Sequence, residues 1–389
     1  MWSGLGRRCA MSKRILSIVG TRPEAIKMAP VLRALQRHPG FESRLCVTAQ
    51  HREMLDQALN VFDISPDHDL NLMEYTQDLT TFLSRALIGL RDVLRQDAPD
   101  CVLVQGDTSS CLAGALAAFH EGIPIGHVEA GLRTGNLDAP FPEEANRRLV
   151  AHIASYHFAP TEIARNNLLQ ENIPAGSIFV TGNTVIDALL LARRMLEQQN
   201  DKFGAFTGAE RLRRKCGEFH KLILVTGHRR ENCPDRFSLI GSAIGKLAAS
   251  HPGCLFVYAV HPNTLFTASV HKSLASLANV ELTAPLDYLL FVWLMARADL
   301  ILTDSGGVQE EALALGKPVL VMRDATERSE AVTLGTARLI GNDTESIVRG
   351  IEELLTDEAV YRRMAIAHDA YGDGSASARI VEQIARELA

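Results

Sequence analysis

An apolar run at residues 300–303 stops at Ser305-Gly306-Gly307 and continues as a helical pattern that contains Glu311. Glycines let a turn approach a bound group closely, and the first turn of the following helix offers unpaired N–H groups and a positive dipole end. These features predict a seat for phosphate. Because Glu311 lies about one turn into the helix, where it could accept hydrogen bonds from the hydroxyls of a ribose, the stretch predicts a nucleotide diphosphate site. The alternative is a glycine-rich turn with a capping Ser and a first-turn Glu.

Other polar residues follow other predicted strands. They are the cations Arg22, Lys27, Arg147 and Arg328, the acids Asp107, Glu129 and Glu143, and His228. Open α/β sheets bind ligands at the carboxyl ends of their strands, and two such domains facing each other would bring these groups into one cleft. The alternatives are solvated surface charge for Arg22 and Lys27, dipole complementation for Glu143, and positioning of a helix N-terminus for Asp107.

Several kinds of site lack support in the sequence. His127 and Glu129 lie on one strand face without a third metal ligand in view, so a metal site is a minor alternative. Dinucleotide GxGxxG, P-loop and G-x-S-x-G motifs do not occur. What is left is a nucleotide diphosphate handled by acids and a histidine.

Two reactions suit these groups. In glycosyl transfer from a nucleotide sugar, the site stabilises the departing diphosphate while a carboxylate or His deprotonates an acceptor. In isomerisation of the sugar, the C2 proton is barely acidic, so direct removal and return is implausible. Loss of the C2 proton together with the diphosphate gives a glycal, and re-addition from the other face inverts C2. That path needs a base, an acid and tightly held UDP.

Composition narrows the class of protein. The 40 Lys and Arg residues against 46 Asp and Glu give no basic field for nucleic acid and no polybasic membrane patch. No apolar run approaches the roughly 20 residues of a membrane span. Seven scattered cysteines, with Cys46, Cys101 and Cys254 in apolar strand-like runs, indicate buried thiols in a reducing cytoplasm. Residues 1–12 lack an apolar signal-peptide core, and we treat them as a disordered extension.

The elements that must position these groups are strands that alternate with helices. The predicted strand-bearing runs are 14–19, 44–49, 101–108, 123–129, 156–160, 178–180, 221–226, 254–260, 280–283, 300–303, 318–322 and 337–340, with 156–160 and 178–180 as edge strands. This pattern predicts an α/β fold of two doubly wound, Rossmann-like parallel sheets. We predict an N-terminal domain of residues 13–183 plus 372–389 and a C-terminal nucleotide-binding domain of residues 184–371. The periodicity fails over residues 200–220, the candidate boundary stretch.

Seven motifs resemble, in order, those of the bacterial non-hydrolysing UDP-N-acetylglucosamine 2-epimerases. They are GTRPEAIK at 20–27, QHREML at 50–55, GDT at 106–108, HVEAGLR at 127–133, PEEANR at 142–147, TGHRREN at 226–232 and TDSGGVQEE at 303–311. The resemblance implies the two-domain glycosyltransferase-B architecture, no metal or nicotinamide cofactor, and interconversion of UDP-GlcNAc and UDP-ManNAc by elimination to 2-acetamidoglucal and re-addition.

The resemblance also implies residue roles. Asp107, Glu129, Glu143 and His228 would be catalytic. Arg22, Lys27, Arg147, Phe291, Ser305, Gly306, Gly307, Glu311 and Arg328 would bind substrate, with Phe291 near the uracil. Gln50, His51, Arg229 and His261 would form a second UDP-GlcNAc site that activates the enzyme. Leu286 stands where some relatives have Gln in the uracil loop.

We therefore expect a cytoplasmic homodimeric epimerase that supplies sugars for cell-surface polysaccharide. A related enzyme acting on a C6-oxidised or diacetamido UDP-sugar is the nearest alternative. A glycosyltransferase and a non-catalytic nucleotide-sugar sensor are alternatives from other classes; the sensor would keep Ser305 and Glu311 but could dispense with the acids.

Overall fold

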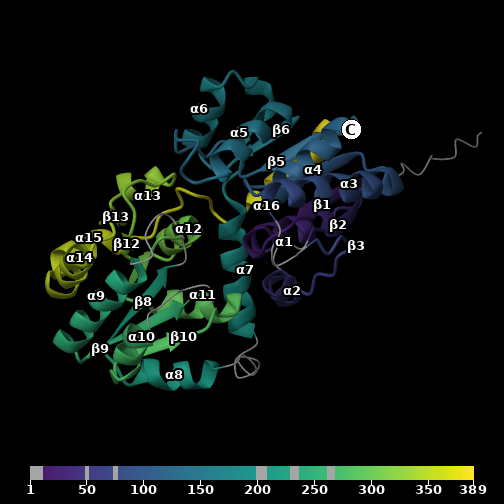
Figure 1. Cartoon of the computed structure of the whole chain (residues 1–389). Coiled ribbons are helices and arrows are strands. Elements are labelled where there is room, and N and C mark those ends of the chain that lie inside the picture. Colours follow the sequence, from purple (N-terminus) through teal and green to yellow (C-terminus); the bar gives the residue numbers. More distant parts are fainter. Residues whose placement is uncertain (1–11, 49–51, 73–77, 199–207, 228–235, 261–267) are drawn as a thin grey trace, which may run out of the picture. The chain divides into compact units, whose positions relative to one another are not determined.

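The computed structural model describes residues 12–48, 52–72, 78–198, 208–227, 236–260 and 268–389. The chain divides into two compact units (Figure 1). Unit 1 is Met1–Ala188 with Gly374–Ala389, and unit 2 is Leu189–Asp373. The expected extension, residues 1–12, lies outside the described residues except for its last residue.

Unit 1 is built on a parallel sheet of seven described strands. They are β1 (Lys13–Val19), β2 (Phe41–Val47), β3 (His68–Asp69), β4 (Cys101–Gln105), β5 (Ile125–Val128), β6 (Tyr156–Ala159) and β7 (Ile178–Val180), in the spatial order β3-β2-β1-β4-β5-β6-β7. The strand order reverses between β1 and β4, and ligands of doubly wound folds bind where it does. Of the two predicted edge strands, β7 lies at the edge, but β6 pairs with both β5 and β7, so that prediction was wrong for β6.

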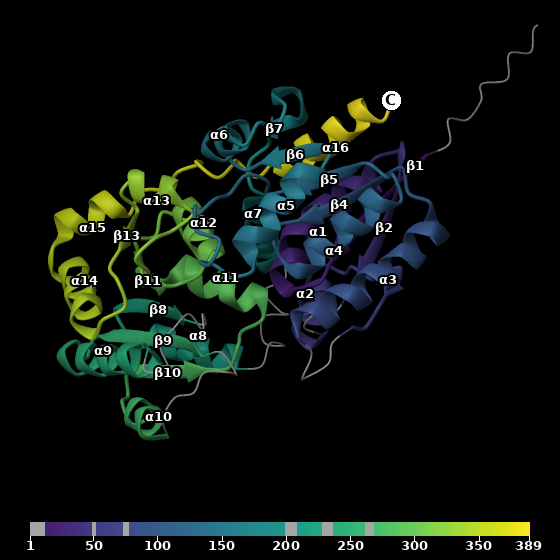
Figure 2. The ribbon, with the colours of Figure 1, turned by 45° about the horizontal axis from the view of Figure 1, so that its top comes forward.

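Helices cover both faces of this sheet. On one face α3 (Leu79–Asp97), α4 (Ser109–His120) and α5 (Glu143–Ile153) lie side by side (Figure 2). Leu16 and Ile18 of β1 and Val102 of β4 pack beneath them in one apolar core. On the other face α1 (Arg22–Arg37) packs against α2 (Arg52–Val61) and the C-terminal α16 (Ala376–Glu387). Next to α5 on the first face, α6 (Glu162–Gln170) covers β6 and β7.

Unit 2 repeats the architecture with six described strands. They are β8 (Lys221–Gly227), β9 (Cys254–Val260), β10 (Val280–Thr283), β11 (Leu300–Thr303), β12 (Val319–Val321) and β13 (Ala337–Leu339), in the order β10-β9-β8-β11-β12-β13. Its helices are α8 (Ala209–Gly217), α9 (Arg236–Ser250), α10 (Ala268–Ala275), α11 (Tyr288–Arg297), α12 (Gly306–Ala314), α13 (Ser329–Thr333), α14 (Thr344–Thr356) and α15 (Glu358–Met364). The strand order reverses between β8 and β11, and α12 follows β11 directly.

Residues 200–220, where periodicity was predicted to fail, contain α8, whose apolar stripe of Ala209, Leu212 and Cys216 is obscured by the charged residues between them. At the other end of the chain, α16 belongs to unit 1. Its first turn is capped by the buried Asp187 carboxylate, which accepts hydrogen bonds from the N–H of Ser377 at 2.8 Å and its hydroxyl at 2.6 Å.

The described helices include none that is both long enough and apolar enough to cross a lipid bilayer. Cys46, Cys101 and Cys254 are buried free thiols in β2, β4 and β9, as their apolar surroundings in the sequence predicted. Burial raises the pKa of the Cys101 thiol to about 12, so this group is an inert packing residue.

Candidate active site

The carboxyl edge of the unit 1 sheet holds a buried ion pair between Lys27 and Glu129. Lys27 lies in α1, which follows β1, and Glu129 directly follows β5. Both side chains are at least nine-tenths buried. The Asn183 side-chain amide donates to the same Glu129 oxygen, Oε2, at 2.9 Å. Because removal of one partner would leave a buried charge without compensation, the two residues form one functional unit.

Glu129 also has an unusual backbone conformation. Its φ of +65° lies in the left-handed region, which side-chain-bearing residues adopt rarely and at a cost of about 1–3 kcal/mol. Glycine would fit this position without strain. A carboxylate held at a strained position at the end of a strand indicates that its chemistry, rather than the fold, requires it.

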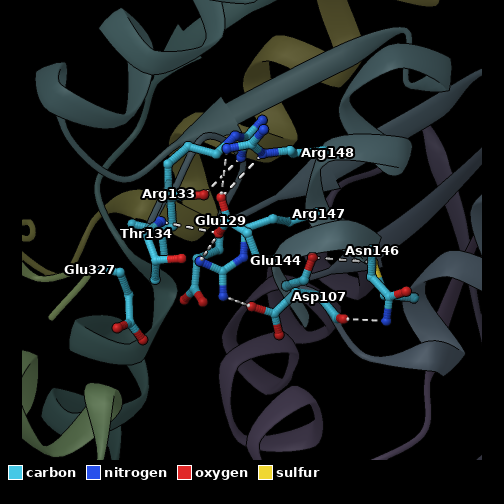
Figure 3. Close-up of polar contacts among 12 residues, drawn as sticks. Asp107, Glu129, Arg133, Thr134, Glu144, Asn146, Arg147, Arg148 and Glu327 are labelled. Carbon is cyan, nitrogen blue, oxygen red and sulfur yellow. Dashed lines mark hydrogen bonds and ion pairs between the residues drawn. The ribbon is translucent and has the colours of Figure 1, made fainter. Parts of the chain in front are cut away.

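The neighbouring strand supplies a second carboxylate, Asp107, two residues after β4. Arg147 of α5 forms an ion pair with the Asp107 carboxylate, and the Asn146 amide donates to the Asp107 carbonyl oxygen at 2.9 Å (Figure 3). The Arg147 side chain is 4% exposed, whereas that of Asp107 is 25% exposed. Asp107 is therefore held by buried partners while part of its carboxylate stays accessible, as contact with a substrate would require.

Arg147 carries unused hydrogen-bonding capacity. Its buried Nε has no hydrogen-bond partner among the described residues, and a buried donor in this state costs about 1–3 kcal/mol. Because this atom is inaccessible to solvent, it does not itself offer a contact to a ligand.

Glu144, which follows Glu143 in the first turn of α5, is fully buried and contacts the long loop before this helix. Its carboxylate accepts the N–H of Thr134 at 3.0 Å and of Gly135 at 3.3 Å, and pairs with Arg147 at 3.3 Å (Figure 3). Glu143, the predicted catalytic acid, is partly exposed at the first position of α5. Neighbouring Glu residues thus differ in burial, which the sequence alone does not distinguish.

His127 does not behave as a metal ligand. Its buried ring lies with Nε2 2.7 Å from the Gly106 carbonyl oxygen, so Nε2–H donates to that oxygen. Burial lowers the pKa of His127 to about 3, so the ring is neutral. Glu129 is engaged by Lys27 instead, and the described residues contain no group of three or more His, Cys, Asp or Glu side chains placed to hold a metal.

The stretch predicted to hold phosphate lies at the start of α12 in unit 2. Ser305 is the N-cap of α12, yet its hydroxyl makes no capping hydrogen bond, and Glu311 lies beyond the first turn of the helix. The capping Ser and the first-turn Glu of the alternative interpretation are therefore not observed. A Cβ on Gly306 would lie 2.9 Å from Cζ of Arg328, whereas nothing lies within 4 Å of the Cβ position of Gly307. Gly306 therefore lets Arg328 approach the N-terminus of α12, and the space beside Gly307 stays open.

Arg328 reaches this position within a buried cluster of charges. Its Nε donates to Glu310 at 2.7 Å and its Nη1 to Glu327 at 2.5 Å, and Arg323 pairs with the second oxygen of Glu327 at 2.9 Å. The carboxylates offset the repulsion between the guanidinium and the positive helix end. Sequence reasoning identified Arg328 but not the carboxylates that hold it.

Glu311, the predicted ribose acceptor, is buried and oriented by α11. The Tyr288 hydroxyl donates to Glu311 Oε1 at 2.8 Å. Phe291 lies one turn beyond Tyr288 on α11 and is partly exposed, whereas Leu286 is buried just before this helix. Tyr288 was missed because a single Tyr in an apolar helix carries no sequence signal of its partner.

The structure thus joins Lys27 with Glu129, and Asp107 with Arg147, in unit 1. It joins Gly306 with Arg328 on one helix end, and places Glu311 on the same helix, in unit 2. Arg22 is partly buried at the first position of α1. The remaining predicted residues, His228, Gln50, His51, Arg229 and His261, lie outside the described residues.

Comparison with known proteins gives a consistent result. The family model described as UDP-N-acetylglucosamine 2-epimerase matches residues 33–385. The UDP-N-acetylglucosamine 2-epimerase of Salmonella typhimurium is 54% identical over 377 residues, which cover 95% of this chain and 98% of the relative. The crystal structure of UDP-GlcNAc 2-epimerase from Neisseria meningitidis bound to UDP-GlcNAc is 47% identical, with a TM-score of 0.90 over 96% of this chain and 100% of that one.

A more distant structure, the glycotransferase of kitacinnamycin, shares the fold at 15% identity, with a TM-score of 0.63 over 97% of this chain and all of that one. The predicted pair of Rossmann-like parallel sheets in a glycosyltransferase-B-like architecture is confirmed. Because the family model and the full-length relatives agree, this chain belongs to the UDP-N-acetylglucosamine 2-epimerase family.

Proposed function

We propose that this chain interconverts UDP-GlcNAc and UDP-ManNAc by eliminating UDP to form 2-acetamidoglucal and adding it back after protonation of the opposite face of C2. The observation that carries the proposal is the pair of carboxylates at the ends of the adjacent strands β4 and β5, each held by its own cation: Asp107 by Arg147, and Glu129 by Lys27. Inversion of C2 needs proton transfer on two faces, and two separately held acids supply it.

The elimination step balances as follows. A carboxylate takes the C2 proton, the C–H electron pair forms the C1–C2 double bond, and the C1–O bond breaks with its electrons passing to the β-phosphate of UDP. In the return step a second acid protonates C2 from the other face and the phosphate oxygen rejoins C1. We assign these transfers to Asp107, Glu129, Glu143 and His228, with Asp107 closest to the sugar because its side chain is partly exposed.

We assign the nucleotide to unit 2. The diphosphate lies on the N–H groups at the start of α12 beside Arg328, the ribose hydroxyls on Glu311, and the uracil near Phe291. Ser305, Gly306 and Gly307 form the seat, and the Arg328 cation stabilises the charge that develops on departing UDP. We assign Arg22, Lys27 and Arg147 to contacts with the sugar and diphosphate, as the family resemblance implies.

Incubation with UDP-GlcNAc alone in deuterated water tests the reaction. Deuterium at C2 and formation of UDP-ManNAc, followed by NMR, are the expected results. The shared glycosyltransferase fold favours glycosyl transfer as the second candidate, and that reaction would need an added sugar acceptor. Retention of the original C2 hydrogen during turnover refutes the elimination mechanism.

The role of Asp107 has a matched control at the other end of the same strand. Asp107→Asn should lower kcat by about 10²-fold or more with KM little changed, because it removes a proton-transfer group. Asp100 lies at the opposite end of β4, where it accepts a hydrogen bond from the N–H of Arg14 at 2.8 Å. Asp100→Asn should leave kcat unchanged. Equal losses of kcat and substrate affinity in Asp107→Asn would make Asp107 a structural residue.

We also propose that the enzyme is a homodimer. The neighbouring helices α3, α4 and α5 expose Ile88, Phe119 and Leu149, each more than half accessible, although large apolar side chains usually avoid water. A second copy of the chain would cover them. Ile88→Glu combined with Phe119→Glu should convert a dimer to a monomer in light scattering, and a wild-type monomer at micromolar concentration contradicts the proposal.

The activating site and the cellular role complete the proposal. We propose that a second UDP-GlcNAc activates the enzyme through Gln50, His51, Arg229 and His261, as the family resemblance implies. UDP-ManNAc alone should then turn over slowly until a trace of UDP-GlcNAc is added. We propose that the enzyme works in the cytoplasm and that its product is used to build cell-surface polysaccharide. The buried free thiols support a reducing compartment such as the cytoplasm.

A further inference from the structure

A set of polar side chains, three of them buried and one partly buried, lies around the start of α4, just after Asp107 in the chain. It consists of Glu24 in the first turn of α1, Thr108 at the N-cap of α4, Ser110 in α4 and Thr48 after β2. Glu24 is 1% exposed, and Ser110 and Thr48 are fully buried. The Thr48 and Ser110 hydroxyls lie 2.8 Å apart and hydrogen-bond to each other. Sequence reasoning assigned none of these four residues a role.

Glu24 is the centre of this set. Its Oε1 accepts the hydroxyl proton of Thr108 at 2.7 Å, and its Oε2 accepts the N–H of Gly20 at 3.0 Å. One carboxylate therefore ties the loop after β1 to the start of α4. The two strands concerned, β1 and β4, are the neighbours between which the strand order reverses.

The hydrogen bond to Glu24 determines how the Thr108 hydroxyl is oriented. A hydroxyl has one proton to donate, and that of Thr108 goes to Glu24. Its lone pairs are then directed to accept the N–H of Cys111 at 3.1 Å, which caps α4. Without Glu24, the hydroxyl is free to rotate and the cap loses its orientation.

Thr108 immediately follows Asp107, and the flanking backbone is held as well. The Gly106 carbonyl accepts from His127 at 2.7 Å, and the Asp107 carbonyl accepts from Asn146 at 2.9 Å. Three consecutive residues are thus each fixed by a side chain from a different element. Of these anchors, Glu24 is the only carboxylate.

We infer that Glu24 is a positioning residue that holds the Asp107 carboxylate in its reactive orientation through the Thr108 hydroxyl. The inference rests on the proposed function, because it concerns the reaction assigned to Asp107. Glu24 is too deeply buried to contact the sugar. Its burial raises the pKa to about 7, so the site retains a carboxyl group whose charged form is costly to bury. A residue needed only for packing would be apolar there.

Kinetics of paired variants test the inference. Glu24→Ala and Thr108→Val should each lower kcat about 10- to 100-fold with KM within about twofold, because a small misplacement of a catalytic group costs about that much. Thr108→Ser keeps the hydroxyl and should restore most of kcat. In an Asp107→Asn background, Glu24→Ala should change the residual rate by less than about twofold.

If Glu24→Ala lowers kcat by the same factor in the Asp107→Asn background as in wild type, the inference is overturned. A variant that changes KM but leaves kcat unaltered would overturn it as well. Asp187→Asn is the matched control, because Asp187 is a buried carboxylate of unit 1 that caps α16. It should destabilise the protein without changing kcat. An equal kcat loss in this control would show that any damage to the unit 1 fold lowers activity and would refute a specific role for Glu24.

Hydrogen exchange separates the inference from the proposed function. The Cys111 amide, which donates to the Thr108 cap, should exchange faster in Glu24→Ala than in wild type, whereas amides in α14 should not change. If the wild-type protein has no epimerase activity, the proposed function fails. Independently of activity, unchanged exchange of the Cys111 amide in Glu24→Ala overturns the link from Glu24 to Thr108. If Glu24→Ala does not fold, Thr108→Val in both backgrounds decides the question.

Discussion

Replacing Glu24 by Gln should change how stability depends on pH. Burial raises the pKa of Glu24 from its ordinary value of 4.5 to about 7, against smaller lowering effects of its hydrogen bonds to Thr108 and Gly20. The folded protein therefore holds this proton more tightly than the unfolded chain does. The resulting stabilisation is complete below pH 4.5 and is lost as the pH rises through 7.

The size of the effect follows from the shift. One pKa unit corresponds to about 1.4 kcal/mol, so the wild-type protein should lose about 2–3 kcal/mol from this group between about pH 5 and pH 8. Gln cannot titrate. The free energy of unfolding of Glu24→Gln, measured relative to wild type at each pH, should therefore rise by about 2–3 kcal/mol over that range.

Because the chain has two units, the assay must report on unit 1 alone. Amide exchange of Val102 and Val104 in β4, measured in the regime where it reports the free energy of opening, does so. Comparison of the variant with wild type at the same pH removes the intrinsic dependence of exchange on pH. A difference that stays constant from pH 5 to pH 8 would refute the reasoning, because Glu24 would then be no more protonated in the folded protein than in the unfolded chain.

Three further outcomes are expected. His127, whose pKa is lowered to about 3 by burial, contributes stability that is complete above about pH 6.5 and is lost as the pH falls toward 3, so His127→Gln should flatten acid unfolding over that range. Lys27→Met should cost about 3–5 kcal/mol in chemical denaturation by leaving Glu129 buried without its counter-charge, and Glu129→Leu in the same chain should recover part of that loss. Tyr288→Phe should weaken UDP binding about 5- to 10-fold in calorimetry, because it releases Glu311, the proposed ribose acceptor. Tyr361→Phe, which removes a hydroxyl bonded to a backbone carbonyl, should not weaken it, and equal affinities for the two variants would contradict the role of Tyr288.

Local patterns were sufficient to predict most strands. Cys254–Val260, Val280–Thr283 and Leu300–Thr303 have the predicted bounds, because apolar runs flanked by polar turns are what strands buried on both faces require. The two-residue β3 was missed because a pair of residues carries no periodicity. The interior position of β6 was missed because pairing order is a property of the assembled sheet.

The sequence predicted the candidate site residues that belong to a recognisable motif. It did not predict residues that differ from surface residues only in being buried. Ser305, Gly306 and Glu311 stand in one stretch, so their spacing alone indicated a ligand. Glu24 and Glu144 have the same side chain as many surface residues of the chain. Only the packed structure distinguishes them. Glu24 accepts a hydrogen bond from Thr108, which is distant in the sequence, and Glu144 accepts one from Thr134 in an irregular loop.

The return of α16 to unit 1 has a consequence for biosynthesis. A ribosome completes all of unit 2 before it adds Ala376, Ile380, Val381 and Ile384, the buried residues of α16. Until then the side of α1 that packs against this helix stays open to water, so unit 2 can finish folding while the nascent unit 1 still presents an apolar strip to chaperones.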